Sequence, residues 1–172
     1  MSRLFFALWP DTQIRVEIYD YVSGIPLENG RLLARSNTHI TLAFLGNVDE
    51  ETSARLIAAA GNLSIAPFSI SLDQVGWWRK PKIAWLAPSS YPDELTRLAA
   101  GLHKLSEDCG LSMEARPYRP HLTFARKVTK AVSDNLHRPI SWNINEFCLL
   151  ESKSSRSGVE YQVKVRWPLK IM

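Results

Sequence analysis

The chain has 172 residues, of which 45% are hydrophobic and 22% are charged, with 21 basic and 17 acidic side chains. This hydrophobic content and the small net charge of +4 exclude an intrinsically disordered chain, and the length suits one domain. No apolar run approaches the roughly 18–20 residues that a membrane span needs. The apolar part of the opening segment is too short for a signal peptide, so residues 4–9 are predicted to form a strand.

The remaining elements follow from hydrophobic periodicity, helix-capping residues and turn signals. Helices alternate with strands, yet several neighbouring strands are joined by short turns. This mixture favours an α+β architecture with mostly antiparallel pairing over a parallel sheet. Helices are expected after Asp11, at about 49–61 and at about 92–110, and strands at 32–35, 38–45, 68–75, 82–86, 111–116, 121–126, 145–151 and 159–167.

The chain contains a weak internal repeat. A helix, a short strand and a histidine-bearing strand occur at about 12–45 and again at about 92–126. No linker or low-complexity segment separates the copies. We therefore expect one bilobal domain over residues 1–172, in which two pseudo-symmetric, mostly antiparallel sheets are flanked by helices and face a central cleft.

The repeat is centred on two related strands, His39-Ile-Thr-Leu-Ala-Phe and His121-Leu-Thr-Phe-Ala-Arg. Alternate side chains of a strand share a face, so His, Thr and Ala are expected on one face. The apolar residues between them, Phe44 included, are expected in a core. Two matching His-x-Thr pairs are far more than four His and seven Thr give by chance. The alternative is that each His-x-Thr pair simply lies on a half-exposed strand and has no role in a site.

Two histidines and two threonines, without a nearby carboxylate or cysteine cluster, make a poor metal site. They suit acid–base catalysis, in which a neutral imidazole removes one proton and an imidazolium donates another. The hydroxyls can donate hydrogen bonds to a phosphate held between them. In-line displacement at phosphorus needs the acid and the base on opposite sides, and two facing lobes provide that arrangement.

These residues resemble the two-histidine (2H) phosphoesterase superfamily, and within it the bacterial RNA 2′,3′-cyclic phosphodiesterase or 2′-5′ RNA ligase family. The resemblance rests on the twin motifs, on Arg3-Leu-Phe-Phe-Ala, and on the closing Gly158-Val-Glu-Tyr and Trp167-Pro-Leu segments. It implies hydrolysis of 2′,3′-cyclic phosphate at RNA 3′ ends to a 2′-phosphomonoester, without metal, cofactor or ATP. A 5′-hydroxyl in place of water would give a 2′-5′ linkage.

The resemblance also implies individual roles. His39 would donate a proton to the departing 3′ oxygen, and His121 would accept one from water. Thr41 and Thr123 would hold phosphate oxygens. Arg126 would contact the phosphate, although strand alternation alone would send it off the end of the motif face.

Four further residues are candidate contacts to RNA. Phe5 lies on the less apolar face of the first strand and can stack a base, with an ordinary core position as an equal alternative. Trp78 lies in an aromatic and basic turn, although most tryptophans serve as core residues. Tyr118 and Arg119 directly precede the second motif.

Basic charge is concentrated near the second motif. Residues 1–86 carry no net charge, whereas residues 87–172 carry the whole +4, and 116–138 holds six basic residues against one acidic residue. This distribution predicts a rim that faces RNA, with a solvated basic loop as the alternative.

The sequence thus predicts a monomeric cytoplasmic enzyme that acts on RNA with cyclic phosphate ends, tRNA fragments among them, and has no membrane partner. Cys109 and Cys148 are expected to be free thiols. One alternative is a phosphodiesterase for a small nucleotide, such as an ADP-ribose cyclic phosphate or a 2′-5′ oligoadenylate. Another is an RNA-binding protein without turnover, against which the completeness of both motifs argues.

Overall fold

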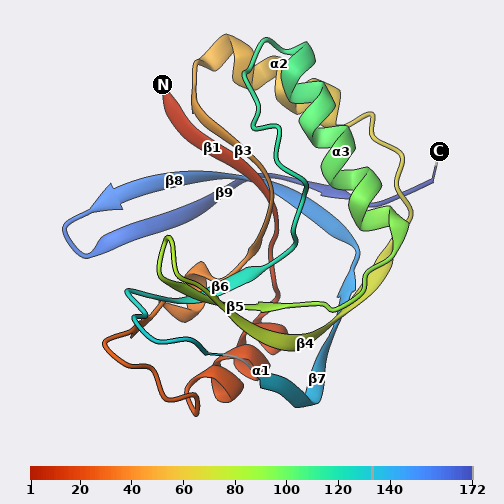
Figure 1. Cartoon of the computed structure of the whole chain (residues 1–172). Coiled ribbons are helices and arrows are strands. Elements are labelled where there is room, and N and C mark those ends of the chain that lie inside the picture. Colours follow the sequence, from red (N-terminus) through yellow and green to blue (C-terminus); the bar gives the residue numbers. More distant parts are fainter. Residues whose placement is uncertain (133, 172) are drawn as a thin grey trace.

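The strands form a curled antiparallel sheet, and helices lie beside it (Figure 1). The computed structural model describes residues 1–132 and 134–171. In chain order the elements are β1 (Ser2–Leu8), α1 (Thr12–Val22), β2 (Arg31–Leu32), the 3₁₀ helix η1 (Arg35–Asn37), β3 (Ile40–Val48), α2 (Glu50–Ala60), β4 (Phe68–Trp78), β5 (Ile83–Ala87), α3 (Asp93–Asp108), β6 (Leu122–Arg126), β7 (Asp134–Ile144), β8 (Glu146–Ser155) and β9 (Gly158–Pro168).

The strand order is β7-β4-β5-β6-β3-β1-β8-β9, with β2 also paired to β6, and every pairing is antiparallel. The α+β class with mostly antiparallel strands is confirmed. The two expected sheets are hydrogen-bonded into one, because β3 pairs with β6 through Ile40 and Leu122. Within the described residues, no helix is long and apolar enough to cross a membrane.

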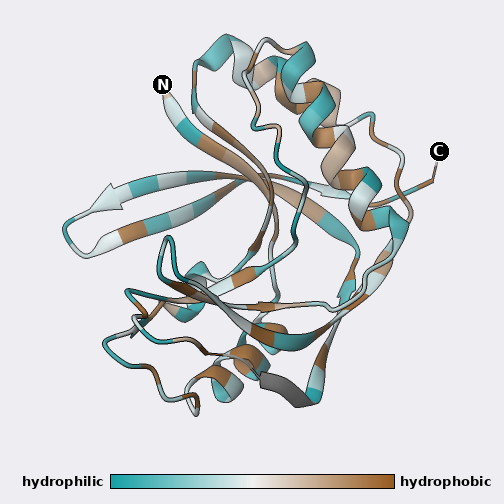
Figure 2. Cartoon of the chain, in the orientation of Figure 1, coloured by the Kyte–Doolittle hydropathy of each residue, from teal (hydrophilic) through white to brown (hydrophobic). Residues whose placement is uncertain are grey.

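The helices form where the capping residues and apolar stripes predict them. The side chain of Asp11 accepts a hydrogen bond from the Ile14 amide at the start of α1, and Asp49 does the same for Thr52 in α2. The apolar stripe of α3 is buried and packs toward β3, while α1 packs against β7. Hydrophobic and hydrophilic residues accordingly alternate along α3 and along the strands (Figure 2). Cys109 and Cys148 are buried free thiols, as expected.

A β-bulge in β3 corrects the expected position of Phe44. Pairing with β1 steps from Thr41 opposite Ala7 to Ala43 opposite Phe6, so β3 contains an extra residue at this point. Alternation is reversed beyond the bulge: Ala43 packs in the core, and Phe44 returns to the face that carries Thr41. Phe44 is therefore 52% exposed rather than buried.

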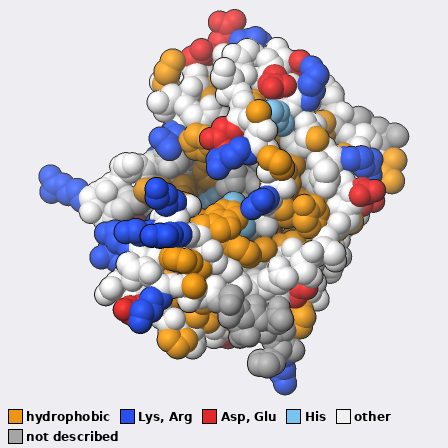
Figure 3. All heavy atoms as spheres, in the orientation of Figure 1, with side chains coloured by type: hydrophobic (Ala, Val, Ile, Leu, Met, Phe, Trp, Pro, Cys, Tyr) orange, Lys and Arg blue, Asp and Glu red, His pale blue; other side chains and the backbone are white. Residues whose placement is uncertain are grey.

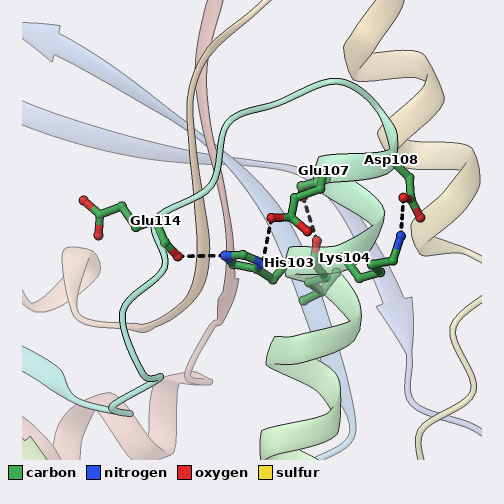
Figure 4. Close-up of polar contacts among 7 residues, drawn as sticks. His103, Lys104, Glu107, Asp108 and Glu114 are labelled. Carbon is green, nitrogen blue, oxygen red and sulfur yellow. Dashed lines mark hydrogen bonds and ion pairs between the residues drawn. The ribbon is translucent and has the colours of Figure 1, made fainter.

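The expected strand at 111–116 is absent from the structure. β6, the strand that follows this segment, already has β5 along one edge and β3 with β2 along the other, so the segment cannot form a hairpin with it. It is held instead by His103 of α3, whose Nε2 lies 2.8 Å from the carbonyl oxygen of Glu114 (Figure 4). The expected strand at 32–35 is similarly reduced to β2 followed by η1.

Strand β7 was not expected from the sequence. It contains Pro139, which cannot donate a ladder hydrogen bond and therefore indicates a loop. β7 tolerates this residue because, among the described residues, it is an edge strand that pairs with β4 alone.

Candidate active site

Both His-x-Thr motifs lie where the two halves of the sheet meet. Ile40 and Leu122 pair across β3 and β6 and point into the core. The antiparallel register therefore sets His39 across from Thr123 and Thr41 across from His121, on the opposite face, which we call the motif face. In the space-filling view the molecule is hollowed near its centre, with histidine atoms inside the hollow and Lys and Arg side chains beside it (Figure 3).

Two hydrogen bonds and three aromatic rings hold the His39 side chain. Its Nδ1 lies 2.8 Å from the Asn37 carbonyl oxygen, which can only accept, so Nδ1 carries a proton. Its Nε2 lies 3.1 Å from the Thr41 hydroxyl. The ring contacts those of Phe5, Trp9 and Tyr161, at centroid distances of 4.9, 6.1 and 5.0 Å respectively.

His121, on the other half of the sheet, has the same Nδ1 bond to the backbone and one aromatic neighbour. Its Nδ1 donates to the Arg119 carbonyl oxygen at 2.8 Å. The ring packs edge-on against Trp78 at a centroid distance of 4.5 Å. In both motifs, therefore, the carbonyl two residues before the histidine fixes the tautomer and leaves Nε2 as the nitrogen that can exchange a proton with a substrate.

Both imidazoles favour the neutral form. The pKa of His39 is lowered from 6.5 to about 4, chiefly by burial and further by the charges of Arg15, His121 and Arg126, while the hydrogen bond to Asn37 opposes the shift. The pKa of His121 is also lowered, first by burial and then by Arg116. An anion bound between the histidines would raise both pKa values, because it stabilises the protonated forms.

A second bulge brings Arg126 to the motif face. Pairing of β6 with β5 steps from Thr123 opposite Trp85 to Ala125 opposite Ala84, so alternation is reversed after Phe124. Ala125 is buried in the core and Arg126 is exposed, close enough for its charge to lower the pKa of His39. Phe44 occupies the equivalent position in the first motif, because both motifs contain the same bulge.

A model of the 2′-5′ RNA ligase superfamily matches residues 10–156. The chain belongs to this superfamily. It is 34% identical over 172 residues to the RNA 2′,3′-cyclic phosphodiesterase of Escherichia coli (strain K12), with 98% of this chain and 97% of that protein covered. A Methanocaldococcus jannaschii protein of the same name is 27% identical over 177 residues, covering 96% and 99%. The crystal structure of E. coli LigT complexed with 3′-AMP matches with a TM-score of 0.91 at 34% identity, covering 98% of both chains.

In this member of the 2′-5′ RNA ligase superfamily, two of the predicted RNA contacts, Phe5 and Tyr118, make contacts with other residues of the protein. Phe5 is only 4% exposed and packs against His39 and Tyr161, so it supports the imidazole rather than presenting a free face to a base. The Tyr118 hydroxyl donates to the Thr41 carbonyl at 3.0 Å and so links the two motifs. Burial raises the pKa of Tyr118. Trp78 is half-buried against His121, and the Arg119 side chain is exposed.

Sequence reasoning missed four residues around the site: Arg15, Trp9, Phe44 and Tyr161. Tyr161 lies in a segment that carried the family resemblance and Trp9 follows another, but strand patterning gave no reason to place either beside His39. No group of three or more His, Cys, Asp or Glu side chains in the described parts of the chain is arranged to hold a metal ion.

Proposed function

We propose that this protein hydrolyses the 2′,3′-cyclic phosphate at RNA 3′ ends to a 2′-phosphomonoester. The observation that carries the proposal is the register of β3 and β6, which sets each motif histidine across from the other motif's threonine. Relatives named RNA 2′,3′-cyclic phosphodiesterase, matched along nearly the whole chain, support the same reaction.

The proposed reaction is a single in-line displacement at phosphorus. Nε2 of His121 accepts a proton as the water oxygen bonds to phosphorus. The bond from phosphorus to the 3′ oxygen breaks, and Nε2 of His39 gives its proton to that oxygen. The 2′ ester bond is retained, so the product is the 2′-phosphate. A 5′-hydroxyl in place of water would give the 2′-5′ linkage by the same proton transfers.

The phosphate would be held by the groups that surround the two nitrogens. Thr41 and Thr123 donate hydrogen bonds to its oxygens, and Arg126 balances its charge. Because the pKa of His39 in the free protein is about 4, we infer that the substrate anion recruits the catalytic proton when it binds.

Phe44 is a better candidate than Phe5 for stacking the terminal nucleobase. It lies on the motif face beyond Thr41, the residue is 52% exposed, and the guanidinium carbon of Arg3 lies 5.0 Å from its ring centroid. Stacking on an aromatic ring tolerates any base, so this contact would not by itself select the terminal nucleotide.

The test is to incubate the protein, in EDTA, with an oligonucleotide that ends in a 2′,3′-cyclic phosphate, and to identify the phosphate isomer produced. We expect a 2′-phosphate at an undiminished rate. Loss of activity in EDTA would contradict metal-free chemistry, and a 3′-phosphate would contradict the assigned leaving group. A product from ADP-ribose cyclic phosphate alone would favour a small-nucleotide substrate.

We also propose that the enzyme acts as a monomer, with tRNA fragments among its substrates. Light scattering tests whether the protein is a monomer.

A further inference from the structure

Arg15 of α1 is a buried cation that binds the chain on both sides of the site. Its residue surface is only 9% exposed. Nε donates to the Pro10 carbonyl at 3.1 Å, directly after Trp9. Nη1 donates to the carbonyls of Arg35 and Thr38, at 2.9 and 2.8 Å, and to the Thr38 hydroxyl at 3.0 Å. Three of these four acceptors lie in the turn that leads into His39.

Arg15 also supports His39 through an aromatic ring. Its guanidinium carbon lies 4.2 Å from the centroid of the Trp9 ring. That ring is stacked on the His39 imidazole, at a centroid distance of 6.1 Å and an interplanar angle of 29°. The cation therefore reaches His39 along two routes, the backbone of the preceding residue and the ring beside it.

Filling space does not account for a cation at this position. Among the described residues no carboxylate forms an ion pair with Arg15, and burial lowers its pKa to about 10 despite the charge of Asp11. An unpaired buried charge is costly, whereas a methionine would fill similar volume without that cost. What the guanidinium adds is a rigid planar set of donors that can hold several carbonyl oxygens at once.

We propose that Arg15 is a positioning residue that orients the His39 imidazole and places its positive charge beside that ring. The effect on turnover rests on the proposed function, whereas the effect on His39 itself does not. The charged and titratable groups around His39 are Arg15 of α1, His121 just before β6, Arg126 of β6, and Tyr161 of β9. Removing Arg15 leaves the other groups in place, so its own contribution can be measured.

The experiment compares the full-length variants Arg15→Met and Arg15→Lys with wild type. NMR titration of the imidazole Cε1 proton follows His39, and kcat and KM are measured on adenosine 2′,3′-cyclic phosphate. In Arg15→Met the His39 midpoint should rise but stay below 6.5, because burial, the largest cause of its lowering, remains. The kcat should fall on the order of 10–100-fold because the imidazole is misplaced. KM should change little, since Arg15 does not touch the substrate.

Arg15→Lys separates charge from geometry. A lysine keeps the charge but cannot hold three carbonyls in a plane, so the His39 midpoint should stay low while kcat falls as in Arg15→Met. Arg55→Met is the matched control, because Arg55 lies on α2 and donates to the Thr52 hydroxyl, away from the site. It should leave both the titration and kcat unchanged.

The proposal is overturned if Arg15→Met lowers the thermal midpoint but leaves the His39 titration and kcat as in wild type. If that variant does not fold, Thr38→Val replaces it, because it removes one acceptor of the guanidinium and keeps the cation. A smaller loss of kcat in Thr38→Val supports the proposal, and an unchanged kcat overturns it. If wild type shows no turnover, the proposed function fails, while the His39 titration still decides the role of Arg15.

Discussion

At the scale of single residues, the proposed chemistry depends on His39 and His121. His39→Ala and His121→Ala should each lower kcat by about 10²–10⁴-fold, the usual contribution of one acid–base group. Both should remain folded, because both side chains lie on the motif face rather than in the core. His103→Ala is the matched control, since His103 lies on α3 and binds Glu114. Circular dichroism checks the fold. A folded His39→Ala or His121→Ala enzyme that retains nearly the full rate would contradict the proposed role of that histidine.

The lowered pKa values of the two histidines lead to a pH prediction. The proposed mechanism needs one protonated and one neutral imidazole, so the pH profiles of kcat and of kcat/KM should both be bell-shaped. In the free protein both pKa values lie below 6.5, so kcat/KM should decline as the pH rises past the lowered values, when both rings are neutral. Bound phosphate raises the pKa values, so the maximum of kcat should lie at higher pH. The limits belong to the coupled pair rather than to either residue.

Profiles of kcat and kcat/KM between pH 4.5 and 8.5 check this prediction. A kcat/KM that rises with pH across this range, or a kcat maximum at lower pH than that of kcat/KM, would be incompatible with substrate-assisted protonation of His39.

At the scale of elements, Tyr118 links the segment before β6 to strand β3. Within the described residues, β3 and β6 pair only at Ile40 and Leu122, so the hydroxyl bond to the Thr41 carbonyl is an important additional link. Tyr118→Phe removes only that oxygen. It should lower the free energy of unfolding by about 1 kcal/mol, the net value of one hydrogen bond, and should also reduce kcat.

Tyr91→Phe is the control for this variant, because Tyr91 is 38% exposed and lies outside the motif strands. Urea unfolding and steady-state rates provide the comparison. A Tyr118→Phe enzyme indistinguishable from the Tyr91→Phe enzyme in both measurements would show that this link is dispensable.

The helices and strands also show which predictions from sequence patterning hold and which fail. Periodicity and capping predicted all three helices, and two-residue alternation placed His39 and Thr41 on one face because no bulge lies between them. Alternation failed beyond the bulges, where Phe44 and Arg126 return to the motif face. A bulge depends on pairing with the neighbouring strand, which is not a local property of the sequence.

At the scale of the whole molecule, the predicted basic rim is only partly free to bind RNA. Arg119 and Lys127 are exposed, whereas Lys130 forms an ion pair with Glu28 at 2.6 Å. Replacing Arg119 and Lys127 together by serine should weaken binding of long RNA ends. The slope of log affinity against log salt should flatten by about 0.7 for each RNA phosphate that the variant no longer neutralises.

Lys130→Ser is the matched control and should change the slope less, because Glu28 already balances that charge. Turnover of a cyclic dinucleotide too short to reach the rim should be nearly unaffected in every variant. Equal losses on long and short substrates would identify the stretch as a solvated loop. The charge pattern of the sequence predicted the rim. It did not predict the ion pair between Lys130 and Glu28, because these two residues lie far apart along the chain.

The assignment of His39 as acid and His121 as base is tested most directly by changing the leaving group. In 3′-deoxyadenosine 2′-(4-nitrophenyl phosphate), water attacks the phosphorus of the same 2′-phosphate ester. The leaving group is nitrophenolate instead of the 3′ oxygen, and it departs without needing a proton. On this substrate His39→Ala should approach the wild-type rate, whereas His121→Ala should remain slower by about 10²-fold or more, because water must still be deprotonated. Equal losses in the two variants, or a loss confined to His39→Ala, would contradict the account.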